Sequence, residues 1–143
     1  MYILVIGCSE IGYHLAKALL ASNHEVVVVD KSRARCDLLT AELGSVALQG
    51  DGTDQTVLRK AGASRAGLVV AATDRDDTNL VACQVAKHRF GAARTISLVN
   101  IPDHDPLFGL LGIDQTINIT ELIVGRIEEH LGGLMFEELD SAG

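Results

Sequence analysis

Six short apolar runs alternate along this chain with stretches that have the spacing of amphipathic helices. The run at residues 25–29 reads EVVVV, with hardly any polar interruption. Strands without polar alternation are typical of a parallel sheet that is covered on both faces. The alternation therefore predicts an α/β fold, a six-stranded parallel sheet with helices on both sides. The expected strands are residues 2–6, 25–29, 46–48, 67–72, 94–99 and 116–119.

Residues with the chemistry of helix caps mark where the helices between these strands begin. Ser32 is expected to cap the second helix, Thr53 or Asp54 the third, and Thr120 the last, with Glu121 in its first turn. The expected helices are residues 10–22, 33–43, 54–62, 76–90 and 107–111, followed by the one after Thr120.

A glycine loop connects the first strand to the first helix. Gly7 permits a tight turn, and Gly12 lets the helix approach the sheet closely. This arrangement predicts a doubly wound, Rossmann-like fold, with a phosphate group at the helix N-terminus. The middle position, which is normally glycine, is Ser9. Ser9 either hydrogen-bonds a phosphate oxygen or weakens phosphate binding, and the alternative is a tight turn that binds no ligand.

An acidic residue ends the second strand, 18 residues after Gly12. An acid at this position accepts hydrogen bonds from ribose hydroxyls and repels a 2′-phosphate, so Asp30 favours NAD or an adenosine nucleotide over NADP. Lys31 weakens this preference slightly. The alternative is that Asp30 serves only the start of the helix at Ser32. The glycine loop and the acid together favour nucleotide binding.

Two further strand ends carry small polar groups, and open sheets bind ligands beyond the carboxyl ends of their strands. Gly50 and Asp51 follow the third strand, where Asp51 would meet the adenine or its ribose. Thr73 and Asp74 follow the fourth strand, beside the second half of a dinucleotide. The alternative is that Thr73, Asp74 and Asp76 only cap the next helix.

Charge and composition exclude several classes of function. The net charge of -7 argues against nucleic acid as a partner, because nucleic acid needs a basic face. No apolar run approaches the roughly 20 residues of a membrane span, and no signal peptide is visible. Cys8, Cys36 and Cys83 lack metal-binding spacing, so no metal site is predicted and a reducing cytoplasm fits. Cys36 and Cys83 are expected in the core.

At residues 1–132 the chain resembles the RCK/KTN (TrkA-N) nucleotide-binding domain, and within that family it is most similar to the TrkA-type cytosolic regulatory subunits of bacterial potassium uptake systems. The segments that carry the resemblance are GCSEIGYHLAKAL, VVVVDKS, LQGDGTDQTVLRKAGASRAGLVVAATDRDDTNLVACQVAK and GIDQTINITELIVGRIEEHL.

The resemblance implies a regulatory domain that is not an enzyme. Such domains bind NAD(H) or ATP/ADP, form dimers that assemble into rings, and pass the binding state to a membrane potassium channel or transporter. It therefore implies a cytoplasmic chain, peripheral to the inner face of the membrane through its transporter. The predicted cofactor-binding residues are Gly7, Cys8, Ser9, Glu10, Ile11, Gly12, Asp30, Lys31, Gly50, Asp51, Thr73 and Asp74.

The chain departs from the family pattern at the phosphates. Besides Ser9, Leu98 stands where TrkA-type subunits tend to have an arginine, so Arg33, Arg35 or Arg75 would have to replace that cation. Family members also carry a smaller C-terminal lobe. Residues 133–143 are thus expected to be an extension that starts a missing or truncated segment. The start at the first strand favours a separate subunit over a channel tail.

The last helix has an apolar stripe that needs a partner. The stripe packs either on the sheet of its own chain or on a second protomer, and the second is favoured because five preceding helices suffice to cover the sheet. Its residues are Leu122, Ile123, Ile127, Leu131 and Leu134.

Other functions stay open beside the regulation of potassium uptake. A cation/proton antiporter uses the same kind of domain, usually as a fused tail. An NAD-dependent oxidoreductase needs a substrate pocket and an acid–base group, for which the nucleotide fold leaves little chain. A vestigial lobe that binds nothing is a further alternative, because of Ser9 and Leu98.

Overall fold

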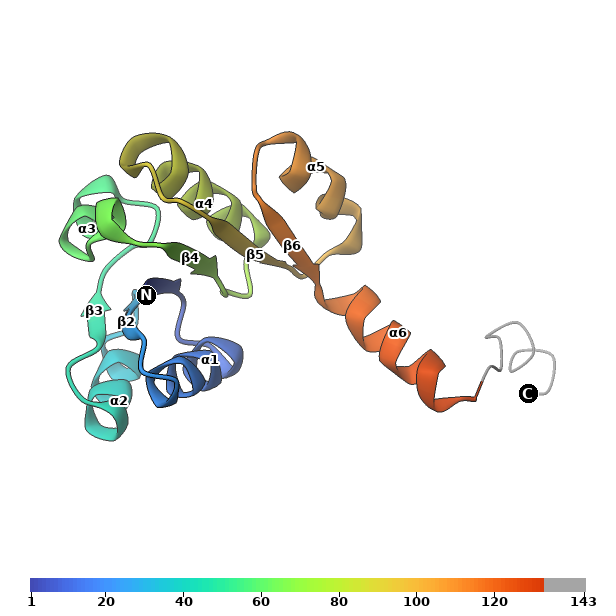
Figure 1. The fold of residues 1–143 in the computed structure, drawn as a ribbon, viewed down its shortest axis with the longest axis horizontal. Coiled ribbons are helices and arrows are strands. Elements are labelled where there is room, and N and C mark those ends of the chain that lie inside the picture. The colour runs from blue at the N-terminus through green and yellow to red at the C-terminus, as the bar shows by residue number, and fades with distance from the viewer. Residues whose placement is uncertain (133–143) are drawn as a thin grey trace.

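A six-stranded, wholly parallel sheet forms the centre of the computed structural model, which describes residues 1–132 (Figure 1). Its strands lie in the order β3-β2-β1-β4-β5-β6. The chain thus runs outward from β1 in one direction and then from β4 in the other, which makes a topological switch point between them. The predicted doubly wound fold is confirmed. The strands are β1 (Tyr2–Ile6), β2 (Glu25–Asp30), β3 (Ala47–Gln49), β4 (Leu68–Ala71), β5 (Thr95–Val99) and β6 (Gln115–Asn118).

The caps predicted for the second and third helices are confirmed. Ser32 accepts a hydrogen bond from Arg35 N, and Asp54 accepts one from Thr56 N. The cap predicted at Thr120 is wrong: the helix begins directly after β6, so Asn118 is the cap. The helices are α1 (Glu10–Ala21), α2 (Arg33–Leu43), α3 (Gln55–Lys60), α4 (Asp76–Phe90), α5 (Asp105–Leu110) and α6 (Ile119–His130), with 3-10 turns η1 (Ala63–Arg65) and η2 (Pro102–His104).

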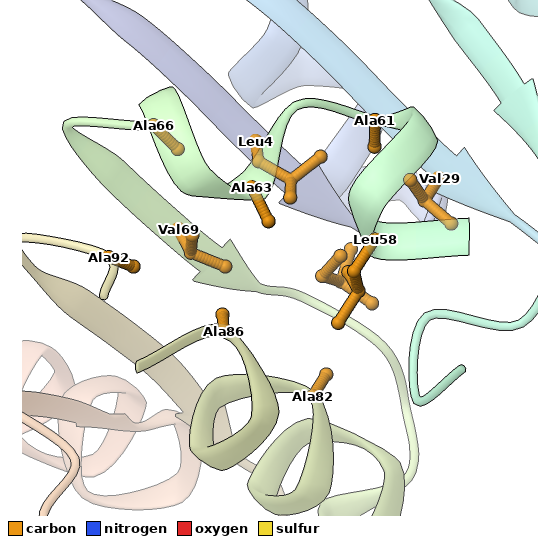
Figure 2. Close-up of a cluster of buried hydrophobic side chains, with 11 residues drawn as sticks. Leu4, Val29, Leu58, Ala61, Ala63, Ala66, Val69, Ala82, Ala86 and Ala92 are labelled. Atoms are coloured by element: carbon orange, nitrogen blue, oxygen red, sulfur yellow. The ribbon is translucent and has the colours of Figure 1, made fainter. Parts of the chain in front are cut away.

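The two faces of the sheet are covered by different helices. On one face Ala16 of α1 and Leu39 of α2 pack on Ile3 and on the valines of β1 and β2. On the other face α3, η1 and α4 meet the sheet largely through alanines (Figure 2). Alanine lets these helices lie close to the strands, which suits a parallel sheet buried on both sides.

The prediction that Cys36 and Cys83 lie in the core is confirmed. Cys36 and Cys83 are both buried. Burial raises the pKa of the Cys83 thiol to about 12, so this side chain is an inert part of the core.

Helix α6 extends away from the sheet (Figure 1). None of its residues is buried, and Leu122 and Ile123 are 55% and 53% exposed. The alternative that the stripe packs on the chain's own sheet is therefore wrong within the described residues. Leu134, the last member of the predicted stripe, lies outside them, as do residues 133–143 as a whole.

No helix within residues 1–132 has both the length and the apolar character needed to cross a membrane.

Candidate functional site

A cleft of about 210 Å³ lies at the carboxyl edge of the sheet, at the switch point between β1 and β4. Ligands of open α/β sheets bind at this place, because the strand order reverses there and leaves a crevice between the loops. The cleft is lined by Ile6, Gly7, Ser9, Val29, Asp30, Lys31, Arg35, Gly50, Gly52, Thr73, Asp74, Arg75 and Thr78.

The glycine loop has the close contacts that only glycine allows. Gly7 has a φ of 101°, in the region that side chains avoid. A Cβ atom on Gly12 would lie 2.0 Å from the Gly7 carbonyl oxygen. These contacts bring the N-terminus of α1 against the end of β1. The first amides of α1 have no acceptor within the helix, so they can bind a phosphate.

Ser9 uses its hydroxyl group inside the fold. Its Oγ donates a hydrogen bond to the Ala72 carbonyl at 2.8 Å and accepts one from Gly12 N at 3.3 Å. Ser9 is thus the cap of α1 and also joins the loop to the end of β4. Because the hydroxyl proton is already donated, the backbone amides are left as the phosphate donors at this turn.

Asp30 connects the loop to the start of α2. Its Oδ2 accepts from Cys8 N and its Oδ1 from Ser32 N, both at 2.7 Å. The side chain is only 9% exposed, and Arg35 Nη1 lies 3.7 Å from Oδ2. Asp30 therefore does serve the helix start, but it also lines the cleft. A carboxylate has about four acceptor positions, so lone pairs remain for ribose hydroxyls.

Two of the three arginines considered as phosphate contacts lie in the cleft wall. Arg35 comes from α2, and Arg75 lies directly before α4. Arg75 is held by Asp77, with its Nη2 at 2.9 Å from Oδ2, whereas Arg35 is only loosely paired. Arg33 pairs with Asp37 at 4.0 Å and does not line the cleft. Arg35 is thus the cation best placed to face an anion.

Asp51 is predicted beside the adenosine, but it does not line the cleft. Its side chain closes a local turn, in which Oδ1 accepts hydrogen bonds from the Thr53 amide and hydroxyl. These hydrogen bonds lower the pKa of the Asp51 carboxyl group. Gly50 and Gly52 form this part of the wall instead. A Cβ atom on Gly52 would lie 2.4 Å from Ile6 Cγ2, so the loop lies directly against β1.

The remaining predicted residues lie around the cleft. Cys8 lines a separate hollow between α1 and α2. Gly12 does not line the cleft, and it packs against the Gly7 carbonyl group. Glu10 and Ile11 line a smaller hollow of about 160 Å³ on the far side of Ser9. That hollow shares Ser9, Thr73 and Asp74 with the main cleft, and its other lining residues are Ala72, Leu98, Asn100 and Ile119.

The capping role considered for Thr73, Asp74 and Asp76 is wrong. Arg75 is the cap residue of α4, and its own side chain makes no capping hydrogen bond. Thr73 bonds instead to the buried Asn79, through Oγ1 at 2.6 Å. Asp76 reaches across to the end of β5.

Asp76 was not predicted to have this role, because its partners are distant in sequence. Its carboxylate accepts from Asn100 N at 2.7 Å, Ile101 N at 3.0 Å and His104 Nδ1 at 2.8 Å. Burial opposes its ionisation, but these hydrogen bonds outweigh it and lower its pKa. Asp76 thus fixes Asn100, which lines the smaller hollow.

Residues 1–132 contain no group of three or more His, Cys, Asp or Glu side chains placed to hold a metal ion.

The 3-2-1-4-5-6 parallel sheet, the glycine loop after β1 and the acid that ends β2 define a Rossmann-type nucleotide-binding domain. More narrowly, the chain belongs to the TrkA-N domain family, whose model matches residues 3–119. The resemblance expected from the sequence is thereby confirmed.

The relatives of the chain include potassium uptake proteins of archaea. It is 31% identical over 129 residues to a "Trk system potassium uptake protein TrkA homolog" of Methanothermobacter thermautotrophicus, covering 90% of this chain and 59% of the relative. It is 35% identical over 128 residues to a TrkA homolog 1 of Methanosarcina mazei, covering 87% of this chain and 31% of that protein. The chain thus spans only about a third to three fifths of these relatives.

Solved structures share the fold. The TrkA-N domain of the Escherichia coli inner membrane protein ybaL has a TM-score of 0.84 at 22% identity, over 91% of this chain and 96% of that one. The GsuK channel bound to NAD has a TM-score of 0.76 at 26% identity, over 85% of this chain and 22% of that one.

Proposed function

We propose that this chain is a nucleotide-binding regulatory domain that controls a membrane potassium transporter or channel and is gated by NAD(H) or ATP/ADP. The observation that carries the proposal is the cleft at the switch point, in which the glycine loop, Asp30 and Arg35 face one space. These groups match the pyrophosphate and ribose of a nucleotide. Membership of the TrkA-N family supplies the link to potassium uptake.

Regulation of this kind follows from linkage. A nucleotide that binds one arrangement of the assembled protein more tightly shifts the assembly toward it, by no more than its differential affinity. Reciprocity then requires that docking on the membrane partner changes the nucleotide affinity. In this proposal the chain is cytoplasmic and lies at the inner face of the membrane through its transporter.

One other function competes with this proposal. The Kef C-terminal domain of Shewanella denitrificans, solved in an AMP-bound form, shares the fold at 20% identity and a TM-score of 0.75. An antiporter of that type is therefore the second candidate for the membrane partner. We also propose that the chain is not an enzyme, because the groups that line the cleft are used to hold a nucleotide and the fold.

Calorimetric titration with NAD⁺, NADH, ATP and ADP tests the site. We expect at least one ligand to bind, and Asp30→Ala to weaken it about 10- to 100-fold, as the loss of charge-assisted hydrogen bonds implies. Asp37→Ala is the matched control, because it removes an equal charge from α2 outside the cleft. Binding by none of the four ligands, or equal binding by Asp30→Ala, would contradict the proposal.

We propose a homo-oligomer in which the exposed stripe of α6 packs on a second protomer, and the family resemblance adds that such dimers assemble into a ring. Light scattering should give a mass above the 15.2 kDa of one chain. Leu122→Glu places a charge in the proposed interface and should weaken association about 30-fold, as for an interface hot spot of about 2 kcal/mol. Leu38→Glu is the control, since Leu38 is a similarly exposed leucine of α2. A monomeric wild-type chain would contradict this part of the proposal.

A further inference from the structure

The smaller hollow continues the nucleotide cleft past the switch point. It lies between the first turn of α1 and the ends of β4, β5 and β6, and Ser9, Thr73 and Asp74 are common to both spaces. A ligand whose adenosine lies beside Asp30, and whose phosphates lie at the glycine loop, would therefore extend into this hollow. The group at its far end decides which nucleotide fits.

The two spaces differ in charge. The main cleft is lined by three cations, Lys31, Arg35 and Arg75, and by the carboxylates of Asp30 and Asp74. The smaller hollow has no lysine or arginine among its described lining residues, and it has two carboxylates, Glu10 and Asp74. Both are exposed: the Glu10 side chain is 93% accessible. Their field therefore acts through water, on whatever group lies at the mouth of the hollow.

The inner wall of the hollow suits a ring more than a phosphate. Leu98 and Ile119 supply apolar surface, and Asn100 supplies an amide. The Asn100 side chain is fixed by Asp76 Oδ1 at 2.9 Å and by the Thr73 carbonyl at 3.2 Å. A third phosphate here would meet two carboxylates, of which only Asp74 has an arginine, Arg75, beside it on the side of the main cleft. A nicotinamide ring carries one positive charge in NAD⁺ and none in NADH, so the carboxylates act differently on the two forms.

We propose that Glu10 and Asp74 make this site select the oxidised dinucleotide, NAD⁺, over NADH. The proposal rests on the proposed function, since it concerns the ligand of the same cleft. Under this proposal, the occupancy of the site rises with the fraction of the dinucleotide that is oxidised. Leu98 is part of this preference, because it adds no cation to the wall of the hollow.

The preference should be modest, because exposed charges interact weakly. One exposed ion pair changes an equilibrium by up to about fivefold, so two carboxylates together should favour NAD⁺ by about five- to tenfold. Screening should reduce this ratio as salt rises from about 50 mM to about 500 mM. The ratio of the two dissociation constants is the quantity to measure, since the adenosine and phosphate contacts cancel in it.

Titrations of the chain with NAD⁺ and NADH test the proposal. Both titrations are made in the same buffer, because His14 Nε2 lies 3.4 Å from Glu10 Oε2. Glu10→Gln and Asp74→Asn should each reduce the preference about two- to threefold, and the double variant should abolish it. Asp37→Asn, with the same change of charge on the outer face of α2, should leave it unchanged.

The outcomes separate this inference from the function on which it rests. Equal affinity for NAD⁺ and NADH, or a preference that survives in the double variant, would overturn the role of the two carboxylates while leaving the nucleotide site intact. ADP lacks the ring, so continued ADP binding by each variant shows that its cleft is folded. Failure of ADP, ATP, NAD⁺ and NADH alike to bind the wild-type chain would instead overturn the proposed function.

Discussion

Replacing Asp76 by alanine is expected to lower the free energy of unfolding by about 3 kcal/mol, the largest effect we expect from a single polar residue here. The side chain is 6% exposed and accepts four hydrogen bonds from Asn100, Ile101 and His104. Without it, the amides of Asn100 and Ile101 lose their acceptor. Thermal unfolding should show a decrease of roughly 10 °C in the midpoint.

Asp77→Ala is the control for Asp76→Ala. The neighbouring carboxylate is 68% exposed and pairs with Arg75 at 2.9 Å. Exposed ion pairs of this kind contribute at most about 1 kcal/mol, so this variant should unfold within a few degrees of the wild type. Equal effects from the two substitutions would show that the buried hydrogen bonds of Asp76 do not stabilise the fold.

The same carboxylate predicts a dependence of stability on pH. The pKa of Asp76 is lower in the folded chain than in the unfolded one, because its hydrogen-bond donors favour the charged form despite burial. Its contribution is therefore fully present above the unfolded value near 3.9 and is lost as the pH falls through the lower, folded value. Asp76→Ala should show a smaller loss of stability than the wild type between about pH 4 and pH 2.

Gly12→Ala is expected to destabilise the chain by about 3 kcal/mol and to weaken nucleotide binding at least about tenfold. The added Cβ would lie 2.0 Å from the Gly7 carbonyl oxygen, which is backbone and cannot rotate away. Either α1 or the loop must shift, and both supply the amides that face the cleft. Denaturant unfolding and calorimetric titration of the same sample would measure the two effects.

Gly109→Ala tests whether the effect of Gly12→Ala depends on the close contact of its Cβ or on the loss of a glycine as such. Gly109 lies in α5, and a Cβ there would meet nothing within 4 Å. Because alanine favours a helix more than glycine does, this variant should be up to about 1 kcal/mol more stable. A Gly12→Ala variant that unfolds and binds like the wild type would mean that the loop tolerates a side chain.

Local patterns in the sequence were sufficient to predict the sheet and most of the helices. The valine run of β2 and the caps Ser32 and Asp54 act over a few residues, so their effects can be inferred without knowing the rest of the fold. The position of Asp30 at the end of β2 can be inferred in the same way, because Asp30 directly follows the valine run. The cap predicted at Thr120 is wrong because β6 passes into α6 without a connecting residue. Whether Asn118 or Thr120 caps the helix depends on where the strand ends.

The tertiary structure alone decided which polar groups face the cleft. Asp51 and Asp76 look alike in sequence, as acids that follow a strand, yet one closes its own turn and the other holds the end of β5. Arg35 enters the cleft from a different helix, and Glu10 lies in the smaller hollow beside Asp74. These positions depend on how loops from separate strands meet at one edge of the sheet. A sequence pattern records spacing along the chain, whereas hydrogen bonds and charges act over distances in space.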